Sequence, residues 1–136
     1  MAQRRPDRTR GPEHDAFWAW CDKGELRLQG CATCRQLSWP PVKACEHCGG
    51  AQLSWEPMSG RGKVVSWCAF ERDYYNGTLP IPWDTILVSL EEGPLFVSNP
   101  EGFSWPQIKP DMPVTVAFID CEDAAGPFRL PVFAPA

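Results

Sequence analysis

The sequence predicts a mainly β protein with an N-terminal helix, a rubredoxin-like zinc ribbon and a five-stranded OB-fold barrel. Two Cys-x-x-Cys pairs near the first third of the chain indicate the ribbon. Short runs of alternating apolar residues, separated by many of the 15 prolines and 11 glycines, indicate the barrel. A chain of 136 residues has room for one small domain and a satellite module. We therefore expect a tail and helix at 1–24, the ribbon at 25–57 and the barrel at 58–136.

The helix is predicted from the residues that stand at its two ends. Pro12 stands near its start and Gly24 just past its end, as is typical of helices. Phe17 and Trp20 share one face, while Trp18 lies about 100° around the helix. Large aromatics on more than one face favour a partner interface formed by these three residues. The alternative is that Trp18 packs back on its own domain.

Charge is distributed unevenly along the chain. The first ten residues carry a formal charge of +3, so the remainder carries −7, because the whole chain carries −4. An acidic body argues against a broad nucleic-acid footprint. For the basic tail we expect a disordered, solubilising terminus, with contact to an acidic partner as the alternative. Asp120, Glu122 and Asp123 form a carboxylate cluster that we expect in a solvated loop.

Four cysteines define the expected metal site. Two cysteines separated by two residues can point into one tetrahedron, and a second such pair completes a closed site that is structural rather than catalytic. Zinc is the expected ion, although iron fits the same thiolate set. A redox dithiol is the rival, but such sites carry a single pair in a βαβ context. His47 is expected to face solvent and not to serve as a ligand. The expected ligands are Cys31, Cys34, Cys45 and Cys48.

Alternating residues predict the strands. Leu26 and Leu28 mark a strand before the first cysteine pair, and Leu53 and Trp55 mark a returning strand after the second. In the barrel the expected strands are 63–70, 85–90, 95–98, 112–119 and 128–133.

A long connection over residues 71–84 interrupts the barrel strands. It holds Tyr74, Tyr75 and Trp83. Long loops in compact domains are often functional. This one has enough aromatic side chains to bind a ligand or a partner.

The chain has little catalytic equipment. Its two histidines are His14 and His47, and it contains no nucleophile elbow, P-loop or paired-carboxylate motif. Cys68 and Cys121 are expected to pack as small apolar residues in strands. The sequence has no run of about 18 apolar residues, so we expect no membrane-spanning helix. We also expect no signal peptide. Seven cysteines, an odd number, fit a reducing compartment, so we expect a cytoplasmic protein.

The order of an N-terminal helix, two Cys-x-x-Cys pairs, a Ser-Gly-x-Gly turn and OB-like strands resembles the DUF35 family. Members of this family are zinc-ribbon and OB-fold proteins that accompany thiolase-like acyl-CoA enzymes. Where the family often has Phe-Pro-Pro-Arg, this chain has Trp39-Pro-Pro-Val42 followed by Lys43. The matching stretches are Gly24-Glu-Leu-Arg-Leu-Gln-x-Cys-x-x-Cys34, Trp39-Pro-Pro41, Cys45-x-x-Cys48-Gly49, Ser59-Gly-x-Gly-x-Val-x-Ser-Trp67, Val88-x-Leu-Glu-Glu-Gly93 and Lys109-Pro-Asp-Met-Pro-Val114.

The resemblance implies a non-catalytic subunit. Its partner would be a thiolase-superfamily or lipid-transfer-protein-like catalytic subunit, in a heterotetramer without membrane or nucleic acid. The complex would cleave carbon–carbon bonds of β-keto or β-hydroxy acyl-CoA thioesters, for example in steroid side-chain or aromatic-acid degradation. This chain would stabilise the partner and shape its CoA channel, binding the CoA thioester only together with the partner.

Under this interpretation one set of residues is expected to contact CoA or the partner: Lys43, Arg61, Lys63, Tyr74, Tyr75 and Trp83. Two other functions remain open at this point. One is binding of single-stranded nucleic acid, which OB folds and zinc ribbons also perform by stacking bases on aromatic side chains. The other is a stand-alone acyl-CoA-binding or redox protein.

Overall fold

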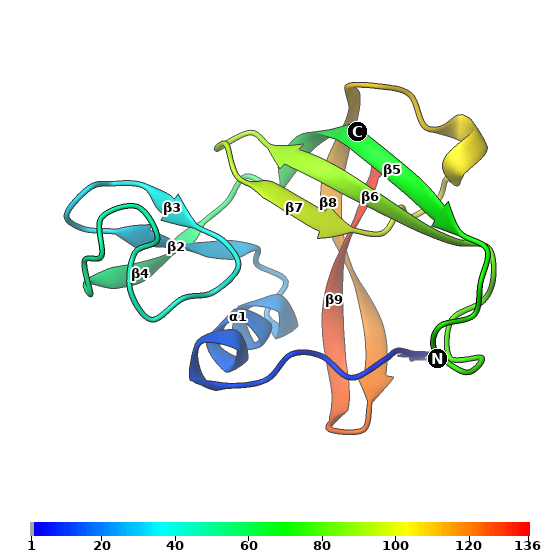
Figure 1. Ribbon diagram of the computed structural model, residues 1–136, viewed down its shortest axis with the longest axis horizontal. Helices are drawn as coiled ribbons and strands as arrows, with labels where there is room; N and C mark the ends of the chain where they lie inside the picture. Colours follow the sequence, from blue (N-terminus) through cyan, green and yellow to red (C-terminus); the bar gives the residue numbers. More distant parts are fainter. Residues whose placement is uncertain (1) are drawn as a thin grey trace.

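The computed structural model describes residues 2–136 and contains two sheets beside one α-helix (Figure 1). The small sheet belongs to the predicted ribbon, and the large, strongly curled sheet belongs to the predicted barrel. The elements are β1 (Gln3–Arg4), α1 (Pro12–Asp22), β2 (Arg27–Cys31), β3 (Leu37–Ser38), β4 (Leu53–Pro57), β5 (Arg61–Phe70), β6 (Trp83–Leu90), β7 (Leu95–Ser98), a 3₁₀ helix (Trp105–Gln107), β8 (Met112–Asp123) and β9 (Gly126–Pro135).

The helix α1 confirms the prediction from proline and glycine punctuation. It begins at Pro12, which needs no amide partner in the first turn. It ends before Gly24, whose φ of 76° is a left-handed conformation that favours glycine. The Gly24 N–H then donates to the Cys21 carbonyl at 2.8 Å. The face that packs inward carries Phe17 and Cys21.

The ribbon sheet has the order β3-β2-β4, with antiparallel pairing on both sides of β2. Leu28 of β2 is fully buried. The chain leaves β2 through the first cysteine pair and returns to β4 after the second, so both knuckles lie at one end of this sheet. The strand–knuckle–loop–knuckle–strand order that the sequence predicts is therefore confirmed.

The large sheet has the order β1-β8-β5-β6-β7, and β9 pairs with β8. All five predicted barrel strands are present, and β8 and β9 form a longer hairpin than expected. Within residues 2–136, no ladder joins β7 to β9, and one isolated bridge connects Pro100, two residues after β7, to Phe133 of β9. The sheet therefore curls into a half-barrel with a seam between β7 and β9.

The Ser-Gly-x-Gly turn has a steric cause. Gly60 has a φ of 82°, which a residue with a Cβ rarely adopts. A Cβ on Gly62 would lie 2.6 Å from Val88 Cγ1 and 2.7 Å from the Ser89 carbonyl oxygen. Both glycines are thus required where β5 enters the sheet against its neighbour β6.

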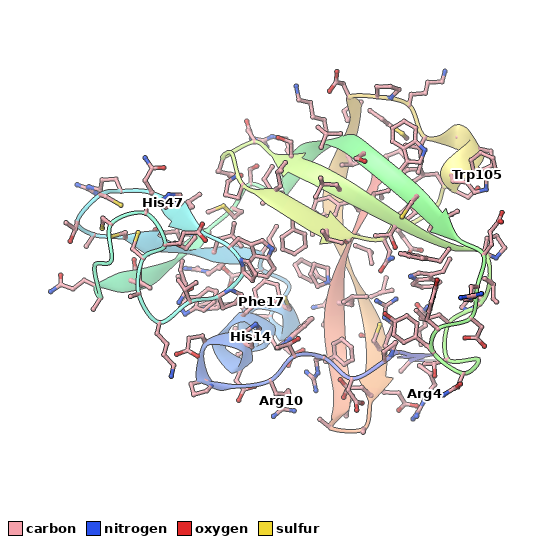
Figure 2. The ribbon with its side chains drawn as sticks, viewed as in Figure 1. Arg4, Arg10, His14, Phe17, His47 and Trp105 are labelled. Carbon is pink, nitrogen blue, oxygen red and sulfur yellow. The ribbon has the colours of Figure 1, made fainter. Side chains whose placement is uncertain are left out.

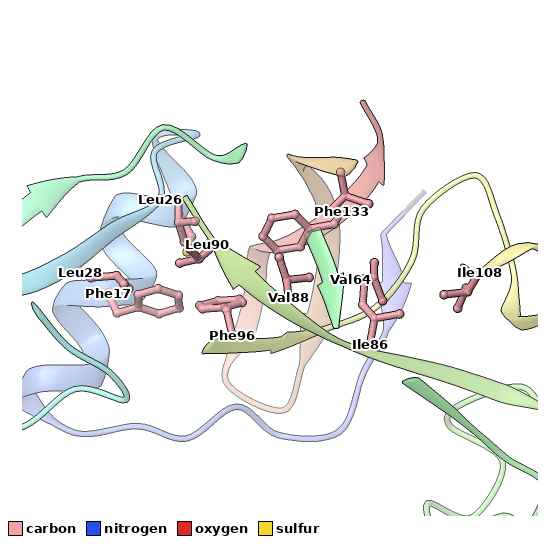
Figure 3. Close-up of a cluster of buried hydrophobic side chains, with 12 residues drawn as sticks. Phe17, Leu26, Leu28, Val64, Ile86, Val88, Leu90, Phe96, Ile108 and Phe133 are labelled. Carbon is pink, nitrogen blue, oxygen red and sulfur yellow. The ribbon is translucent and has the colours of Figure 1, made fainter. Parts of the chain in front are cut away.

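One buried cluster joins the helix, the ribbon and the half-barrel (Figure 3). Phe17 of α1 packs 4.7 Å from the Trp39 ring, and Trp39 stacks on Phe96 of β7 at the same centroid distance. Phe96 in turn contacts Phe133 of β9. This row of aromatic rings fixes the ribbon to the barrel.

The N-terminal tail is ordered, which corrects the expectation of a disordered terminus. Gln3 and Arg4 pair in parallel with Cys121 and Glu122 of β8. The carboxylate cluster lies in this strand and not in a solvated loop. No local pattern predicts this pairing, because its partners stand more than 100 residues apart in the sequence.

Neither α1 nor the 3₁₀ helix is long and apolar enough to cross a bilayer, as judged over residues 2–136. Of the two unassigned cysteines, Cys121 is buried as expected, whereas Cys68 is exposed on β5.

Candidate functional site

The four predicted metal ligands converge at one end of the ribbon. Their sulfur atoms all lie within 4.8 Å of one another. The Cys31 and Cys48 sulfurs are 3.6 Å apart, as are the Cys34 and Cys45 sulfurs. A tetrahedron with Zn–S bonds of about 2.3 Å has edges of about 3.8 Å. The cluster therefore has the dimensions of a closed four-thiolate site, which suits a structural metal such as zinc.

Backbone amides support thiolates in this cluster. The His47 N–H donates to Cys45 Sγ at 3.3 Å. The backbone N–H of Cys34 is the main cause that lowers the pKa of Cys31 to about 6. Metal-binding cysteines act as thiolates, so these amides favour the ligating form.

His47 contacts the ribbon backbone, and its ring is not part of the four-sulfur cluster. Its ring lies on the ribbon, where Nε2 is 2.9 Å from the Leu37 carbonyl oxygen (Figure 2). Its side chain is 44% exposed. A metal ion held by all four thiolates would have no open position for a substrate, which suits a structural site that holds the two knuckles together.

A second feature is a groove of about 560 Å³ over the seam between β7 and β9. Its walls come from the tail, α1, the loop that follows β3, the connection between β5 and β6, and strands β7 and β9. Cavities of this size bind small organic molecules. Aromatic side chains dominate the lining, namely Phe17, Trp18, Trp39, Phe70, Tyr74, Tyr75, Trp83, Phe96 and Phe128.

Of the six residues expected to contact CoA or a partner, three line the groove and three do not. Tyr74 and Tyr75, 63% and 51% exposed, line the groove together with Trp83. The three expected cations, Lys43, Arg61 and Lys63, are exposed and do not line it. Arg61 instead pairs with the Glu91 carboxylate at 2.8 Å.

The three aromatic residues expected at a partner interface lie in different surroundings. Phe17 is only 3% exposed, so a partner cannot reach its side chain in this structure. Trp18 packs back on its own domain: its Nε1 donates to the Thr9 carbonyl at 3.1 Å, and its ring meets Phe128 edge-on. Trp20 lies outside the groove. The docking expectation for the helix therefore depends on Trp20.

Sequence reasoning missed the contribution of the tail to this groove. Arg5 and Arg8 both line it, and Arg5 lies over the Trp83 ring at 5.0 Å. It also missed His14 and Trp39. No local pattern identifies these residues, because the seam brings together segments from both ends of the chain.

Carboxylates at the groove are already engaged. Asp7 accepts a hydrogen bond from the Ala124 amide at 3.1 Å. Asp73 accepts from the Tyr75 and Gly77 amides at 3.0 and 2.7 Å, which folds the loop on itself. Both carboxylates are therefore held by backbone amides, and the apolar lining around them is suited to binding an apolar group.

Two adjacent family models match the chain. Residues 18–54 match the ChsH2 rubredoxin-like zinc ribbon domain, and residues 55–119 match the ChsH2 C-terminal OB-fold domain. The matches meet without a gap and include the four cysteines and strands β5 to β7.

Two curated proteins are similar in sequence. A probable enoyl-CoA hydratase alpha subunit from Thermomonospora curvata is 32% identical over 123 residues, covering 90% of this chain and 37% of that protein. The 3-oxo-4,17-pregnadiene-20-carboxyl-CoA hydratase alpha subunit from Mycobacterium tuberculosis is 31% identical, covering 79% and 34%. The chain thus spans about a third of the length of these relatives.

Two solved structures share the fold. The Ltp2-ChsH2(DUF35) aldolase matches with a TM-score of 0.83 and 27% identity, covering 95% of this chain and 98% of that chain. A DUF35 protein of unknown function from Sulfolobus solfataricus matches with a TM-score of 0.60 and 18% identity, covering 78% of each chain. With its four-cysteine ribbon and its half-barrel, the chain belongs to the DUF35/ChsH2 family.

Proposed function

We propose that this chain is a non-catalytic DUF35-type subunit of a heteromeric acyl-CoA enzyme that cleaves a carbon–carbon bond. The observation that carries the proposal is the match to the Ltp2-ChsH2(DUF35) aldolase, which runs along nearly the whole of both chains. The catalytic partner would resemble the Ltp2 subunit, a lipid-transfer-protein-like or thiolase-type protein. The acids and bases of the reaction would come from that partner.

In this complex the chain would stabilise the partner and form part of its CoA channel. The aromatic groove supports the channel role, because Tyr74 and Tyr75 are exposed at it and can contact both a thioester ligand and a partner surface. Trp20, stacked under Arg27 at 4.0 Å, offers a rigid aromatic surface for docking. The thiolate site supports assembly by holding the ribbon in shape.

The substrate class is proposed from the relatives. The Mycobacterium tuberculosis relative is named for a pregnadiene carboxyl-CoA, a steroid side-chain thioester. A β-hydroxy or β-keto acyl-CoA with a steroid or aromatic acyl group is therefore the first substrate to test. The groove, with its volume of about 560 Å³ and its aromatic lining residues, supports a bulky apolar ligand of this kind.

Co-expression tests the proposal. We would produce this chain with a lipid-transfer-protein-like subunit from the same source and measure their co-elution and the cleavage of a β-hydroxyacyl-CoA. The pair is expected to elute as one complex and to cleave the thioester, while this chain alone does not. Tyr75→Ala should lower activity of the complex without dissociating it.

Trp105→Ala provides the matched control. Trp105, on the 3₁₀ helix (Figure 2), is as exposed as Tyr75 but does not line the groove. Its substitution should leave activity unchanged. A chain that neither binds nor activates any such subunit would refute the proposal.

A further inference from the structure

Arg5 is a cation without an acidic partner at the wall of the groove. Its one side-chain hydrogen bond within residues 2–136 runs from Nη2 to Asn99 Oδ1 at 3.3 Å. Asn99 is fixed in this orientation, because its Nδ2 donates to the Asp84 carbonyl at 2.8 Å. The guanidinium face is stacked over Trp83. Stacking leaves the N–H groups on the edge of the guanidinium free to donate.

The other tail arginines contrast with Arg5. Arg8 pairs with Asp123 at 2.9 Å, Arg10 with Asp15 at 3.0 Å, and Arg4 with Glu122 at 3.8 Å. Each therefore has a carboxylate within the described chain. Arg5 differs from these three arginines because its side chain donates to the side-chain amide of Asn99 and not to a carboxylate.

Burial makes this lack of a counter-charge costly. Desolvation lowers the pKa of the Arg5 guanidinium from its ordinary value. The carboxylates nearest in the lining, Asp7 and Asp73, hold backbone amides of Ala124, Tyr75 and Gly77 instead. A second cation, Arg72, also lines the groove and lies near the Tyr74 ring. The groove thus joins an apolar lining to two arginines, Arg5 and Arg72, for which no carboxylate within residues 2–136 forms an ion pair.

We propose that the groove binds an amphiphilic organic anion, whose carboxylate or phosphate pairs with Arg5 while its apolar body lies on the aromatic wall. Oxyanions match the planar fork of a guanidinium, and such charge-assisted hydrogen bonds are the strong ones. Trp39 and Phe128 belong to the same lining and would contact the apolar body. This inference rests on the proposed function in using the same groove, but it concerns ligand binding by the chain alone.

Calorimetric titration of the full chain tests anion binding with three probes: dodecanoate, dodecyl phosphate and dodecanol. The two anions are kept below their micelle concentrations and dodecanol below its solubility limit. At least one anion should bind roughly ten- to a hundredfold more tightly than the neutral alcohol. The two anions distinguish a carboxylate ligand from a phosphate ligand. Arg5→Gln should reduce anion affinity to that of dodecanol and leave dodecanol binding unchanged.

Arg4→Gln is the matched control, because Arg4 is a neighbouring tail arginine that does not line the groove. Arg5→Lys, which keeps the charge, should retain part of the affinity, and thermal unfolding checks that each variant folds. The inference is overturned if wild type binds anions no better than dodecanol, or if Arg5→Gln binds them as wild type does. Assembly with the catalytic partner is measured separately, so a chain that assembles without binding anions refutes this inference alone.

Discussion

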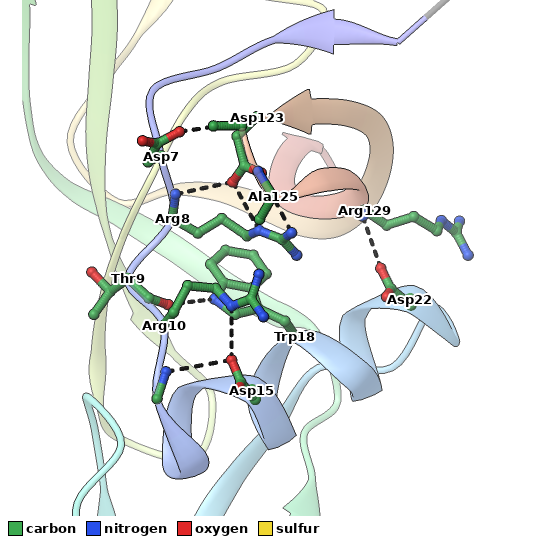
Figure 4. Close-up of polar contacts among 12 residues, drawn as sticks. Asp7, Arg8, Thr9, Arg10, Asp15, Trp18, Asp22, Asp123, Ala125 and Arg129 are labelled. Carbon is green, nitrogen blue, oxygen red and sulfur yellow. Dashed lines mark hydrogen bonds and ion pairs between the residues drawn. The ribbon is translucent and has the colours of Figure 1, made fainter.

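Breaking the ion pair between Arg8 and Asp123 should release the N-terminal tail from the half-barrel. The two side chains are 8% and 1% exposed, and Arg8 Nε lies 2.9 Å from Asp123 Oδ2 (Figure 4). The Arg8 backbone N–H and Nη2 donate to the same carboxylate, and the guanidinium lies 4.2 Å from the Phe128 ring. The carboxylate thus depends on Arg8 for three of its hydrogen bonds.

Arg8→Met removes the charge and keeps most of the side-chain length. Removing one member of a buried pair costs about 3 to 5 kcal/mol, because the other charge stays buried. We expect the lower end, about 3 kcal/mol, because the backbone N–H of residue 8 and the Ala125 amide still donate to Asp123, at 3.1 and 3.0 Å. For a chain of this size that corresponds to a fall in the melting temperature of about 10 °C. Urea unfolding followed by circular dichroism measures the free energy.

Arg4→Met is the control, because the exposed pair of Arg4 with Glu122 should contribute no more than about 0.5 kcal/mol. The double variant of Arg8→Met with Asp123→Asn should lose clearly less than the sum of the single variants, which gives the coupling energy. If Arg8→Met costs no more than the Arg4 control, the tail is not held by this pair and the reasoning fails.

The same pair predicts a pH dependence. Burial of Asp123 opposes its ionisation, but hydrogen bonds from Arg8 and Ala125 outweigh burial and hold the pKa of Asp123 below its ordinary value. A lowered carboxyl pKa contributes stability above the unfolded-state value of about 3.9, and this stability is lost as the pH falls through the folded-state value. Wild type should therefore lose stability below about pH 4 more steeply than Asp123→Asn.

Three further predictions concern the ribbon and the barrel. Elemental analysis should find one zinc or iron ion per chain, and Cys45→Ser should lose it, because three sulfurs no longer close the cluster. Trp39→Ala should lower the free energy of unfolding by about 3 kcal/mol, because Trp39 packs between Phe17 and Phe96; urea unfolding measures it. Gly62→Ala should cost about 1 to 3 kcal/mol in the same assay, because its Cβ would meet the Ser89 carbonyl.

Local signals were sufficient to predict most of the fold. Pro12 and Gly24 define α1 because helix ends are specified by the residues that stand there. The cysteine spacing predicts the ribbon because the ligand geometry depends on neighbours in the chain. The five barrel strands follow from alternation, which is also a local property.

The remaining features depend on contacts that sequence distance conceals. Asp123 was predicted to lie in a solvated loop because Gly126-Pro127 follow the carboxylate cluster; its partner is Arg8, 115 positions away. The sequence left open whether Trp18 faces a partner or packs on its own domain, and its contact with Phe128, 110 positions away, supports the second interpretation. The groove was only half predicted: Tyr74 and Tyr75 follow from a long aromatic loop, whereas Arg5 has no such signal.

The attachment of the tail to β8 has a consequence for the order of folding. Arg5, Arg8 and Asp7 find their partners 94 to 117 positions away, so the tail makes some of the most distant contacts among the described residues. Such contacts form after the local hairpins, because closing a long loop costs entropy before it gains stability. We expect β8 and β9 to pair first and the tail to close over them last. The groove would then exist only in a chain that has folded completely.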